Sequence, residues 1–593
     1  MTRDPSTPLI QAPDPSWPSG DELLAEGAAD ATNWQIGASP FLECVGLPDE
    51  ASYKRACAAS GTITQHAQVG FRDPSRTRDA CAAIFAQCEA RGVIVDRYGF
   101  CLDWSMAVPR ADRAHAQKGT GLILSDEADF VAIASAAPVA PHFGDFVLGF
   151  PAALENTQAA LSAGATAIGN LGQYFTFRTP GFEDDVAATT ATLKAIGLIV
   201  AQPVDVLIHS NLDDGFAAQF SDLVSCLGAA LLEKHVVETL CGGTLSHCFG
   251  HHFTDPVRRL AFQRALARVS DAPGTMIYGS TMSYRGTTAE NYAGLASYLM
   301  TDIISQRTSP SGHAINPVPV MENDRIPDID EIVDAQCFAH RLREEAEVFA
   351  PLIDTRCTDA MVDTLVIEGR RFAERAIAGL ASAGIDINDP CQMLITLRRL
   401  GGYALEETFA DRTPNAERRT FVQASLIDEL DGFANVARSR VSDADVASLK
   451  AGGLTILTAS TDVHCHGKMA LDRFLQACGT RVIDGGMTAD PEAIAATAAE
   501  VNVSAIAIST YNGVALAFAE RLQAALAENL ATAAIPVFIG GRLNQIPATS
   551  NTGLPVDVSD DLATSGVQIC RRFEDIVPPL LKLATPATGA KNP

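Results

Sequence analysis

Short apolar runs alternate with longer amphipathic segments through most of the chain, and this alternation limits the possible folds more than any other feature. The runs at 92–103, 145–151 and 204–210 fit buried strands, whereas DPVRRLAFQRALARV (255–269) fits a helix. Repeated strand–helix units over about 250 to 300 residues favour an α/β fold with a parallel sheet, and that length fits closure into a TIM-like (β/α)8 barrel. An open doubly wound sheet accommodates so many units less readily.

The alternation divides the chain into three predicted parts. Residues 1–60 form an N-terminal arm or extension, of which about the first 30 are expected to be poorly ordered or to wrap around the rest. Residues 61–450 form the TIM-like substrate barrel with helical additions. After AGG at 451–453 the pattern restarts, and five strands with intervening helices predict a flavodoxin-like doubly wound domain over 451–593. A ligand of that domain is expected at the carboxyl ends of its strands.

Composition excludes several classes of partner. The formal net charge is −27 and no basic stripe is visible, so nucleic acid is not an expected partner. No uninterrupted apolar stretch reaches the ~18 to 20 residues of a membrane-spanning helix, and the first residues lack the apolar core of a secretory signal. Fourteen cysteines without a CxxC pair are typical of reduced thiols, which predicts a cytoplasmic protein.

The first strand of the C-terminal part runs directly into Asp462-Val463-His464-Cys465-His466-Gly467, a D-x-H-x-x-G pattern. A neutral imidazole is a good nitrogen ligand for a transition metal. Asp462 can accept the other ring N–H of His464 and so fix its tautomer. Gly467 lets the loop backbone pass close to a ligand before the helix begins. His466 is the alternative metal ligand, but the spacing to Asp462 and Gly467 favours His464.

This pattern resembles the signature of cobalamin-binding domains of the base-off, His-on kind, and the opening of the domain resembles the small subunit of glutamate mutase. The resemblance implies that His464 is the lower axial ligand of cobalt. It also implies that Ser509, Gly540 and Gly541 line a slot for the nucleotide tail of the cofactor. Tyr511 replaces a leucine of the family, and the last loop lacks the family's proline-glycine-threonine turn, so this part of the tail pocket differs.

The region in front of this domain resembles the large subunit of glutamate mutase. Short blocks carry the similarity: Gly149-Phe150-Pro151, the segment 242–245 and SPSGHAINPVPVMEN (309–323). The resemblance implies that both mutase subunits are fused in one chain, with adenosylcobalamin as the cofactor and a homodimer as the assembly.

Four residues of this region are candidates for the catalytic site. Arg97 stands where the family carries a substrate-binding arginine, and its planar guanidinium suits a bidentate pair with a carboxylate. His313 and Glu322 are candidates for holding the adenosyl ribose or the substrate. Tyr174 lies near a glutamate-and-tyrosine block of the family whose glutamate is not evident here. Arg97, His209, Tyr278 and His313 are expected at strand ends that build the active-site face.

Each candidate also has a structural alternative: an ion pair for Arg97, packing for Tyr174, a hydrogen-bonded polar residue beside a turn for His313, and an exposed surface carboxylate for Glu322. The expected function is that of an isomerase, an adenosylcobalamin-dependent radical mutase acting on a small carboxylic or amino acid. Corrinoid-dependent methyl transfer and non-enzymatic cobalamin binding stay open as alternatives. A long α/β region in place of a small helical cap favours the mutase.

Overall fold

The computed structural model describes residues 10–116, 118–179, 182, 184–211, 219–249, 252–281, 284, 286–322, 325–413, 417–461, 465–487, 489–511, 513–547 and 555–584. The chain divides into two compact units. The larger unit is built from residues 8–176 and 184–426, and the smaller unit consists mainly of residues 427–593. Each unit has its own parallel sheet.

A curled parallel sheet forms the centre of the larger unit. Seven strands lie side by side in chain order, and the eighth pairs with the first. The strands are β1 (Thr64–Val69), β2 (Arg97–Phe100), β3 (Ala140–Phe143), β4 (Ala167–Ile168), β5 (Leu207–Asn211), β6 (Thr244–Phe249), β7 (Met276–Ile277) and β8 (Ala314–Ile315). The edge strands β7 and β8 are neighbours in space, but no ladder joins them in the described part of the chain. Closure into a TIM-like barrel therefore stays a prediction.

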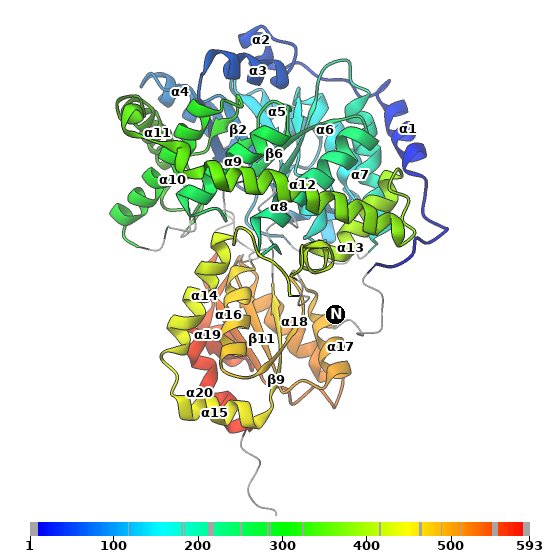
Figure 1. Cartoon of the computed structure of the whole chain (residues 1–593), viewed down its shortest axis with the longest axis vertical. Helices are drawn as coiled ribbons and strands as arrows, with labels where there is room; N and C mark the ends of the chain where they lie inside the picture. Colours follow the sequence, from blue (N-terminus) through cyan, green and yellow to red (C-terminus); the bar gives the residue numbers. More distant parts are fainter. Residues whose placement is uncertain are drawn as a thin grey trace, which may run out of the picture. The chain divides into compact units, whose positions relative to one another are not determined.

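One helix follows each strand and covers the outer face of this sheet (Figure 1). These helices are α4 (Pro74–Glu89), α5 (Glu127–Ala134), α6 (Ala153–Ser162), α7 (Asp185–Val200), α8 (Leu223–Lys234), α9 (Pro256–Val269), α10 (Thr288–Thr308) and α11 (Ile329–Phe349). Two more helices follow, α12 (Asp359–Ser382) against α8 and α13 (Pro390–Phe409) against α7. Shorter turns are η1 (Trp104–Ala107), η2 (Arg113–His115), η3 (Leu171–Phe175), η5 (His235–Leu240), η6 (Ala350–Leu352) and η7 (Thr355–Thr358).

Asp-Pro pairs start several of these helices. Before α4, α9 and α13 an aspartate accepts a hydrogen bond from a backbone N–H of the first turn, and a proline occupies the first helical position. The side chain satisfies a donor that the helix leaves unpaired, and the proline ring fixes a helical φ. The sequence thus marks the residue at which each of these helices begins.

The described N-terminal residues, from residue 10 onward, belong to the larger unit. It forms α1 (Gly20–Asp30), α2 (Pro40–Val45) and α3 (Glu50–Ser60). Helix α1 packs on α7 because glycines bring the two backbones together. A Cβ on Gly27 would lie 1.9 Å from the carbonyl oxygen of Lys194. The polar composition of this segment concealed a small-residue packing face.

Helix α3 lies against the amino ends of the strands. The backbone N–H of Glu50 donates to Thr166 Oγ1, just before β4, at 2.9 Å. Ala51 packs against Ala167 and Leu207, the first residues of β4 and β5. Gly312, just before β8, has φ +71°, and a Cβ there would lie 1.8 Å from the carbonyl oxygen of Lys54. The helix therefore covers the amino end of the curled sheet.

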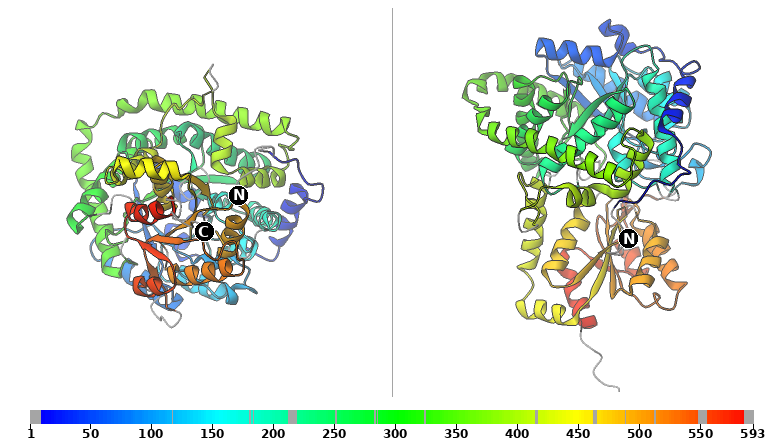
Figure 2. Two further views of the ribbon diagram at one scale, coloured as in Figure 1. Left: turned by 90° about the horizontal axis from the view of Figure 1, so that it is seen from below. Right: turned by 45° about the vertical axis from the view of Figure 1, so that its right-hand side comes forward.

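The smaller unit is a doubly wound domain (Figure 2). Its sheet has the strand order β10-β9-β11-β12-β15, all parallel. The strands are β9 (Thr455–Ser460), β10 (Arg481–Asp484), β11 (Ala505–Thr510), β12 (Val537–Gly541) and β15 (Gln568–Cys570), with a small ribbon of β13 (Asn544–Gln545) and β14 (Val556–Asp557). Its helices are α14 (Ser425–Arg438), α15 (Asp443–Gly452), α16 (His466–Ala477), α17 (Pro491–Val501), α18 (Ala515–Ala527), α19 (Ser559–Thr564), η8 (Phe573–Ile576) and α20 (Val577–Ala584).

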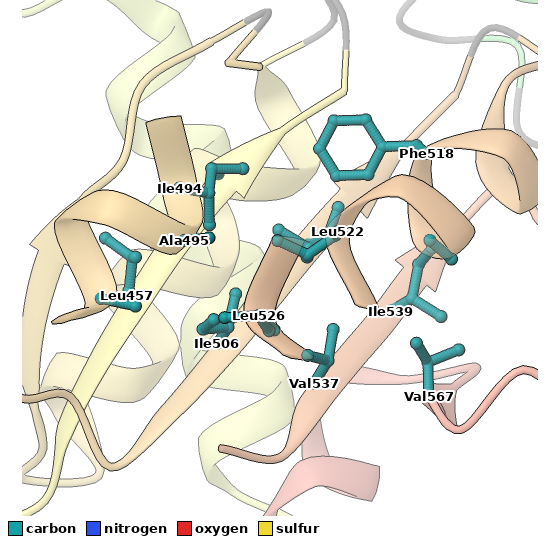
Figure 3. Packing of buried hydrophobic residues seen from close by; sticks show 14 of the residues in the cluster. Leu457, Ile494, Ala495, Ile506, Phe518, Leu522, Leu526, Val537, Ile539 and Val567 are labelled. Atoms are coloured by element: carbon teal, nitrogen blue, oxygen red, sulfur yellow. The ribbon is translucent and has the colours of Figure 1, made fainter. Parts of the chain in front are cut away.

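Two apolar cores cover the two faces of this sheet. Leu457, Ile506 and Ile539 point to the face covered by α17, α18 and α19, and Figure 3 shows this cluster. Alternate residues such as Ile456 and Phe538 point to the other face, which α14, α15, α16 and α20 cover. A sheet that is covered on both faces has strands that read as nearly continuous apolar runs.

The smaller unit begins earlier than the predicted boundary at residue 451. Ala434, Ala437 and Val441 pack in the same core as Ile456 and Phe474. Helices α14 and α15 were assigned to the larger unit because their sequence pattern continues the preceding helical stretch. Their apolar sides instead cover one face of the C-terminal sheet.

Candidate functional site

The carboxyl ends of β9 and β11 are the place where the smaller unit is built to bind a ligand. The strand order reverses between these neighbouring strands, and ligands of doubly wound sheets bind outside the carboxyl ends at such a switch point. Thr461 continues β9, and its backbone N–H donates to the carbonyl oxygen of Ser509 at 3.0 Å. Its hydroxyl donates to Thr510 Oγ1 at 3.2 Å. These bonds join the ends of the two strands.

Small residues line this edge where the sequence predicted a slot. Ser509 is paired in register with Ser460 and with Gly540. Gly467, in the first turn of α16, is so close to Ser509 that a Cβ would lie 2.6 Å from its hydroxyl oxygen. Gly541 has φ +104°, and a Cβ there would lie 2.2 Å from the carbonyl oxygen of Thr510. Gly467 and Gly541 therefore leave no room for a side chain, and Gly541 also has a backbone conformation that favours glycine.

Charged side chains fix the start of α16 beside this edge. Lys468 is buried and lies 2.8 Å from Asp472 Oδ2 and 2.7 Å from Asp484 Oδ1, at the end of β10. Although burial alone would lower it, the two carboxylates raise the pKa of Lys468. The lysine thus anchors the residues that follow the D-x-H-x-x-G pattern to the neighbouring strand. Tyr511, which replaces the family leucine, stacks with Arg542 at 5.9 Å between ring centroid and guanidinium carbon.

Asp462, Val463 and His464 lie outside the described residues. The predicted axial ligand and its carboxylate partner therefore have no structural test here, and their roles stay predictions. The alternative ligand, His466, is the first residue of α16 and is half-buried.

In the larger unit, polar side chains lie on the inner face of the curled sheet. The outward positions contact the helices: Gln65 donates to Gln336 of α11 at 2.9 Å, and Ser210 donates to Glu233 of α8 at 2.9 Å. The register places the alternate positions on the opposite face. The inward positions include His66, Gln68, Arg97, Gly99, His142, Ala167, His209, Ser246, Ala314 and Asn316. TIM barrels usually fill this space with branched apolar side chains, so the polar lining is a departure.

Three inward histidines each lie against a glycine. A Cβ on Gly99 would lie 2.3 Å from His66 Nε2, and one on Gly144 would lie 2.6 Å from His142 Nε2. A Cβ on Gly169 would lie 2.9 Å from His209 Nδ1. Glycine on the neighbouring segment therefore provides the space that each imidazole occupies.

Burial keeps these imidazoles neutral. It lowers the pKa of His66, His142 and His209 well below the usual value, and the charge of Arg97 lowers each further. The rings of His142 and His209 meet edge to face at 4.6 Å. The described residues include no cluster of three or more His, Cys, Asp or Glu side chains arranged to hold a metal ion. The sequence analysis identified His209 but neither His66 nor His142. For His66, the available signal was a polar residue at every second position of TQHAQV (64–69).

Arg97 and His313 lie at the amino end of the sheet, not at the predicted carboxyl end. Strand β2 begins with Arg97, and β8 begins just after His313. Arg97 Nε is 3.0 Å from Glu50 Oε1, and Lys54 Nζ is 3.0 Å from the same oxygen. His313 Nε2 lies 3.5 Å from Arg97 Nη1. The sequence placed these residues wrongly because the apolar run at 92–96 resembles the strand, which starts only after it.

Lys54 and Arg97 both contact the carboxylate of Glu50 at this end of the sheet. Burial alone would raise the pKa of Glu50, but Arg97 and Lys54 hold it below its usual value, so the carboxylate is ionised. Burial lowers the pKa of Lys54 to about 8, which leaves the amine mainly protonated at neutral pH. Arginine stays charged in proteins. Two cations therefore share one carboxylate.

Glu322 lies beyond the carboxyl end of β8, where a catalytic residue was predicted. Its side chain keeps access to solvent, yet the surrounding protein desolvates its carboxyl and raises the pKa to about 7. Burial, together with the charges of Glu322 and Asp145, raises the pKa of the Cys101 thiol, so these acids lie near it. Cys101 donates to Gln68 Oε1 at 3.1 Å, and Gln68 donates to the Tyr278 hydroxyl at 2.9 Å.

Tyr174 points away from this group. Its hydroxyl lies 2.5 Å from Thr189 Oγ1 of α7, and Arg398 lies over its ring at 4.6 Å. The side chain is fully buried between η3, α7 and α13. This position matches the packing alternative, and a role in catalysis has no contact to support it.

Comparison with known protein families identifies the C-terminal region. Residues 452–557 match the B12 binding domain family. A cobalamin-binding domain therefore occupies the smaller unit, and a cobalamin-dependent function follows from it. No curated protein matches the chain. None of the described helices combines the length and apolar character needed to cross a membrane.

The described residues of the smaller unit fit a cobalamin. Ser509, Gly540 and Gly541 offer a hydroxyl and side-chain-free backbone at the switch point, where a group can approach the strand ends closely. Gly467 opens the helix beside them. These residues would hold the nucleotide tail of the cofactor.

Proposed function

We propose that the protein is an adenosylcobalamin-dependent mutase, an isomerase that rearranges the carbon skeleton of a small carboxylic or amino acid. The observation that carries the proposal is the pairing, in one chain, of a B12-binding domain with a curled parallel sheet whose inner face is polar. A methyl carrier needs no such lining. A substrate with polar groups does, because it leaves water on binding and its polar groups must find partners.

Adenosylcobalamin supplies a carbon-centred radical through homolysis of its cobalt–carbon bond. The protein must bind the substrate, orient it and exclude water. Closure of the eight strands into a TIM-like barrel is part of the proposal, and the nearness of β7 to β8 supports it. Helix α3 then covers the amino end of the barrel, so that the carboxyl end is the open end for a substrate.

The larger unit's residues have separate tasks in this proposal. Arg97 and Lys54 supply positive charge toward a substrate carboxylate, while Glu50 holds both side chains in place. His313 positions Arg97. Glu322 lies beyond the carboxyl end of β8, and its pKa of about 7 allows it to donate or accept a proton near neutral pH.

The test is an anaerobic titration of the apo-protein with adenosylcobalamin, followed by absorbance and electron-spin resonance. Binding in the base-off form with nitrogen hyperfine coupling from a protein imidazole is expected. His464→Ala should remove that coupling, whereas the matched variant His466→Ala should keep it. The opposite result would make His466 the ligand.

A panel of small carboxylic and amino acids then decides the reaction class. A cob(II)alamin-coupled radical that appears with one acid, together with a rearranged product, supports the mutase. Demethylation of added methylcobalamin, without a radical from any acid, would replace it by methyl transfer. A homodimer of cytoplasmic location is also proposed, and light scattering of the purified protein at two concentrations tests the assembly.

A further inference from the structure

Two buried side chains on adjacent strands of the larger unit point inward and bond to no described residue. His66 of β1 and Asn316, directly after β8, are both fully buried. Neither ring nitrogen of His66 has a hydrogen-bond partner among the described residues, nor has the amide nitrogen or oxygen of Asn316. Four unpaired polar atoms at one place are unusual, because buried polar groups nearly always find partners.

The backbone at both positions is firmly held from the outer side. Gln336 of α11 donates to the carbonyl oxygen of His66 at 2.9 Å. The Tyr298 hydroxyl of α10 donates to the carbonyl oxygen of Asn316 at 3.1 Å. The two side chains are thus fixed facing inward.

The register sets these residues in one row with Arg97. His66 is the register partner of Arg97, and the pairing of Thr64 with Ala314 places Asn316 beside His66. The row therefore contains two neutral groups, the Asn316 amide and the His66 imidazole, beside Arg97. At this end of the sheet Arg97 and Lys54 both contact the Glu50 carboxylate. Asp96, next in sequence, faces the helices and is bonded to Tyr53 and Gln65.

We propose that His66 and Asn316 bind the carboxylate of the substrate inside the curled sheet, beside the positive charges of Arg97 and Lys54. That the ligand is the substrate rests on the proposed function, whereas the binding site itself consists of residues of the larger unit and does not depend on cobalamin. The neutral imidazole and the amide each donate one hydrogen bond to the carboxylate oxygens. A carboxylate satisfies donors and charge together, which an uncharged ligand does not.

The first test compares binding of propionate, isobutyrate and valerate with that of the corresponding amides, by calorimetry on the full chain without cobalamin. At least one acid should bind saturably and at least about tenfold more tightly than its amide. The variants Asn316→Leu and His66→Leu should lose this binding by about tenfold or more each. Amides binding as tightly as the acids, or no acid binding at all, would overturn the proposal.

The second test separates ligand binding from structure. Because the Asn316 amide has no described partner, Asn316→Leu should leave Tm of the ligand-free protein within about 2 °C or raise it. Asn156→Leu is the matched control, because the buried Asn156 amide donates to Met106 and Phe146 and accepts from Arg113. That control should lower Tm clearly. An equal loss in both variants would show that Asn316 is a structural residue and would sink the assignment.

Cobalamin titration of the same variants keeps the two proposals apart. Asn316→Leu lies in the larger unit and should bind adenosylcobalamin as the unmodified chain does. If acids bind at this row but never give a radical, the mutase proposal fails and the carboxylate site stands. If a radical forms and both variants bind the acid normally, the site fails alone.

Discussion

The two parallel sheets of this protein place their polar residues differently. In the smaller unit both faces of the sheet are apolar, and the hydroxyls and glycines of the candidate cofactor site stand at the strand ends. In the larger unit the outer face packs on helices, while the inner face carries imidazole, amide and guanidinium groups along the strands. An open sheet can bind a ligand only at its edge, whereas a curled sheet has a second, inner face that is available for chemistry.

The difference leads to opposite expectations for substitutions in the middle of a strand. In the smaller unit such a change affects stability, and in the larger unit an inward change affects binding.

Phe538→Ala should destabilise the smaller unit by about 3–5 kcal/mol, because it removes a buried aromatic ring from the middle of β12 and leaves a cavity. Urea unfolding followed by circular dichroism measures the change, and the transition of the larger unit serves as the internal control. If the loss were below about 1 kcal/mol, the face would not be the packed core described above.

Gly541→Ala should weaken cobalamin binding by at least about tenfold with a smaller effect on stability. A Cβ would meet the carbonyl oxygen of Thr510 at 2.2 Å, so the end of β12 must shift at the cofactor edge. Gly566→Ala is the matched control, because Gly566 has a similar φ of +87° but stands before β15, at the amino end, with nothing nearer than 3.8 Å. If Gly541→Ala and Gly566→Ala changed the Kd for cobalamin equally, the carboxyl ends of the strands would not form the binding site.

Glu322→Gln should change how the stability of the larger unit depends on pH, and it should leave the stability at acidic pH unchanged. The carboxyl has a pKa near 7 in the folded chain and a lower one when unfolded, so the folded state holds the proton more tightly. The Glu322 carboxyl contributes stability to the larger unit that is fully present below about pH 4.5. This contribution is lost as the pH rises through 7. The variant should therefore match the unmodified chain near pH 4.5 and exceed it at pH 8.

Thermal unfolding across this pH range measures the difference. Glu290→Gln is a control of opposite sign, since backbone and side-chain hydrogen bonds from Thr287 lower the pKa of that exposed carboxyl. A constant difference between Glu322→Gln and the unmodified chain at every pH would show that the carboxyl is not desolvated.

The sequence predicted the smaller unit better than the larger one, and the reason is physical. Strands such as AIAIST (505–510) begin with a continuous apolar run because both faces of the sheet are covered, and small hydroxyl residues and glycines follow at the strand ends, so the fold and the small residues at this edge could be inferred. The inner face of the larger unit is set by register. Whether His66 or Gln65 faces inward depends on which strand lies beside β1, and that pairing is not local in sequence.

The same limit explains the errors at Arg97 and the N-terminus. An apolar run shows that a strand is near but not where its ladder begins, so Arg97 was placed at the wrong end of β2. The partner of Arg97, Glu50, comes from a segment that was expected to be a separate extension, and a strand pattern contains no information about α3.

Tyr174→Phe should have the smallest effect, a loss of at most about 1 kcal/mol in stability with unchanged turnover. The substitution removes only the hydroxyl that bonds Thr189, and the ring, which Arg398 covers, stays in place. Urea unfolding and the rate of substrate rearrangement measure the two quantities separately. A large fall in kcat with normal stability would return Tyr174 to catalysis. It would also show that a residue on the helix side of the sheet contributes to the chemistry, which would break the contrast between the inner and outer faces.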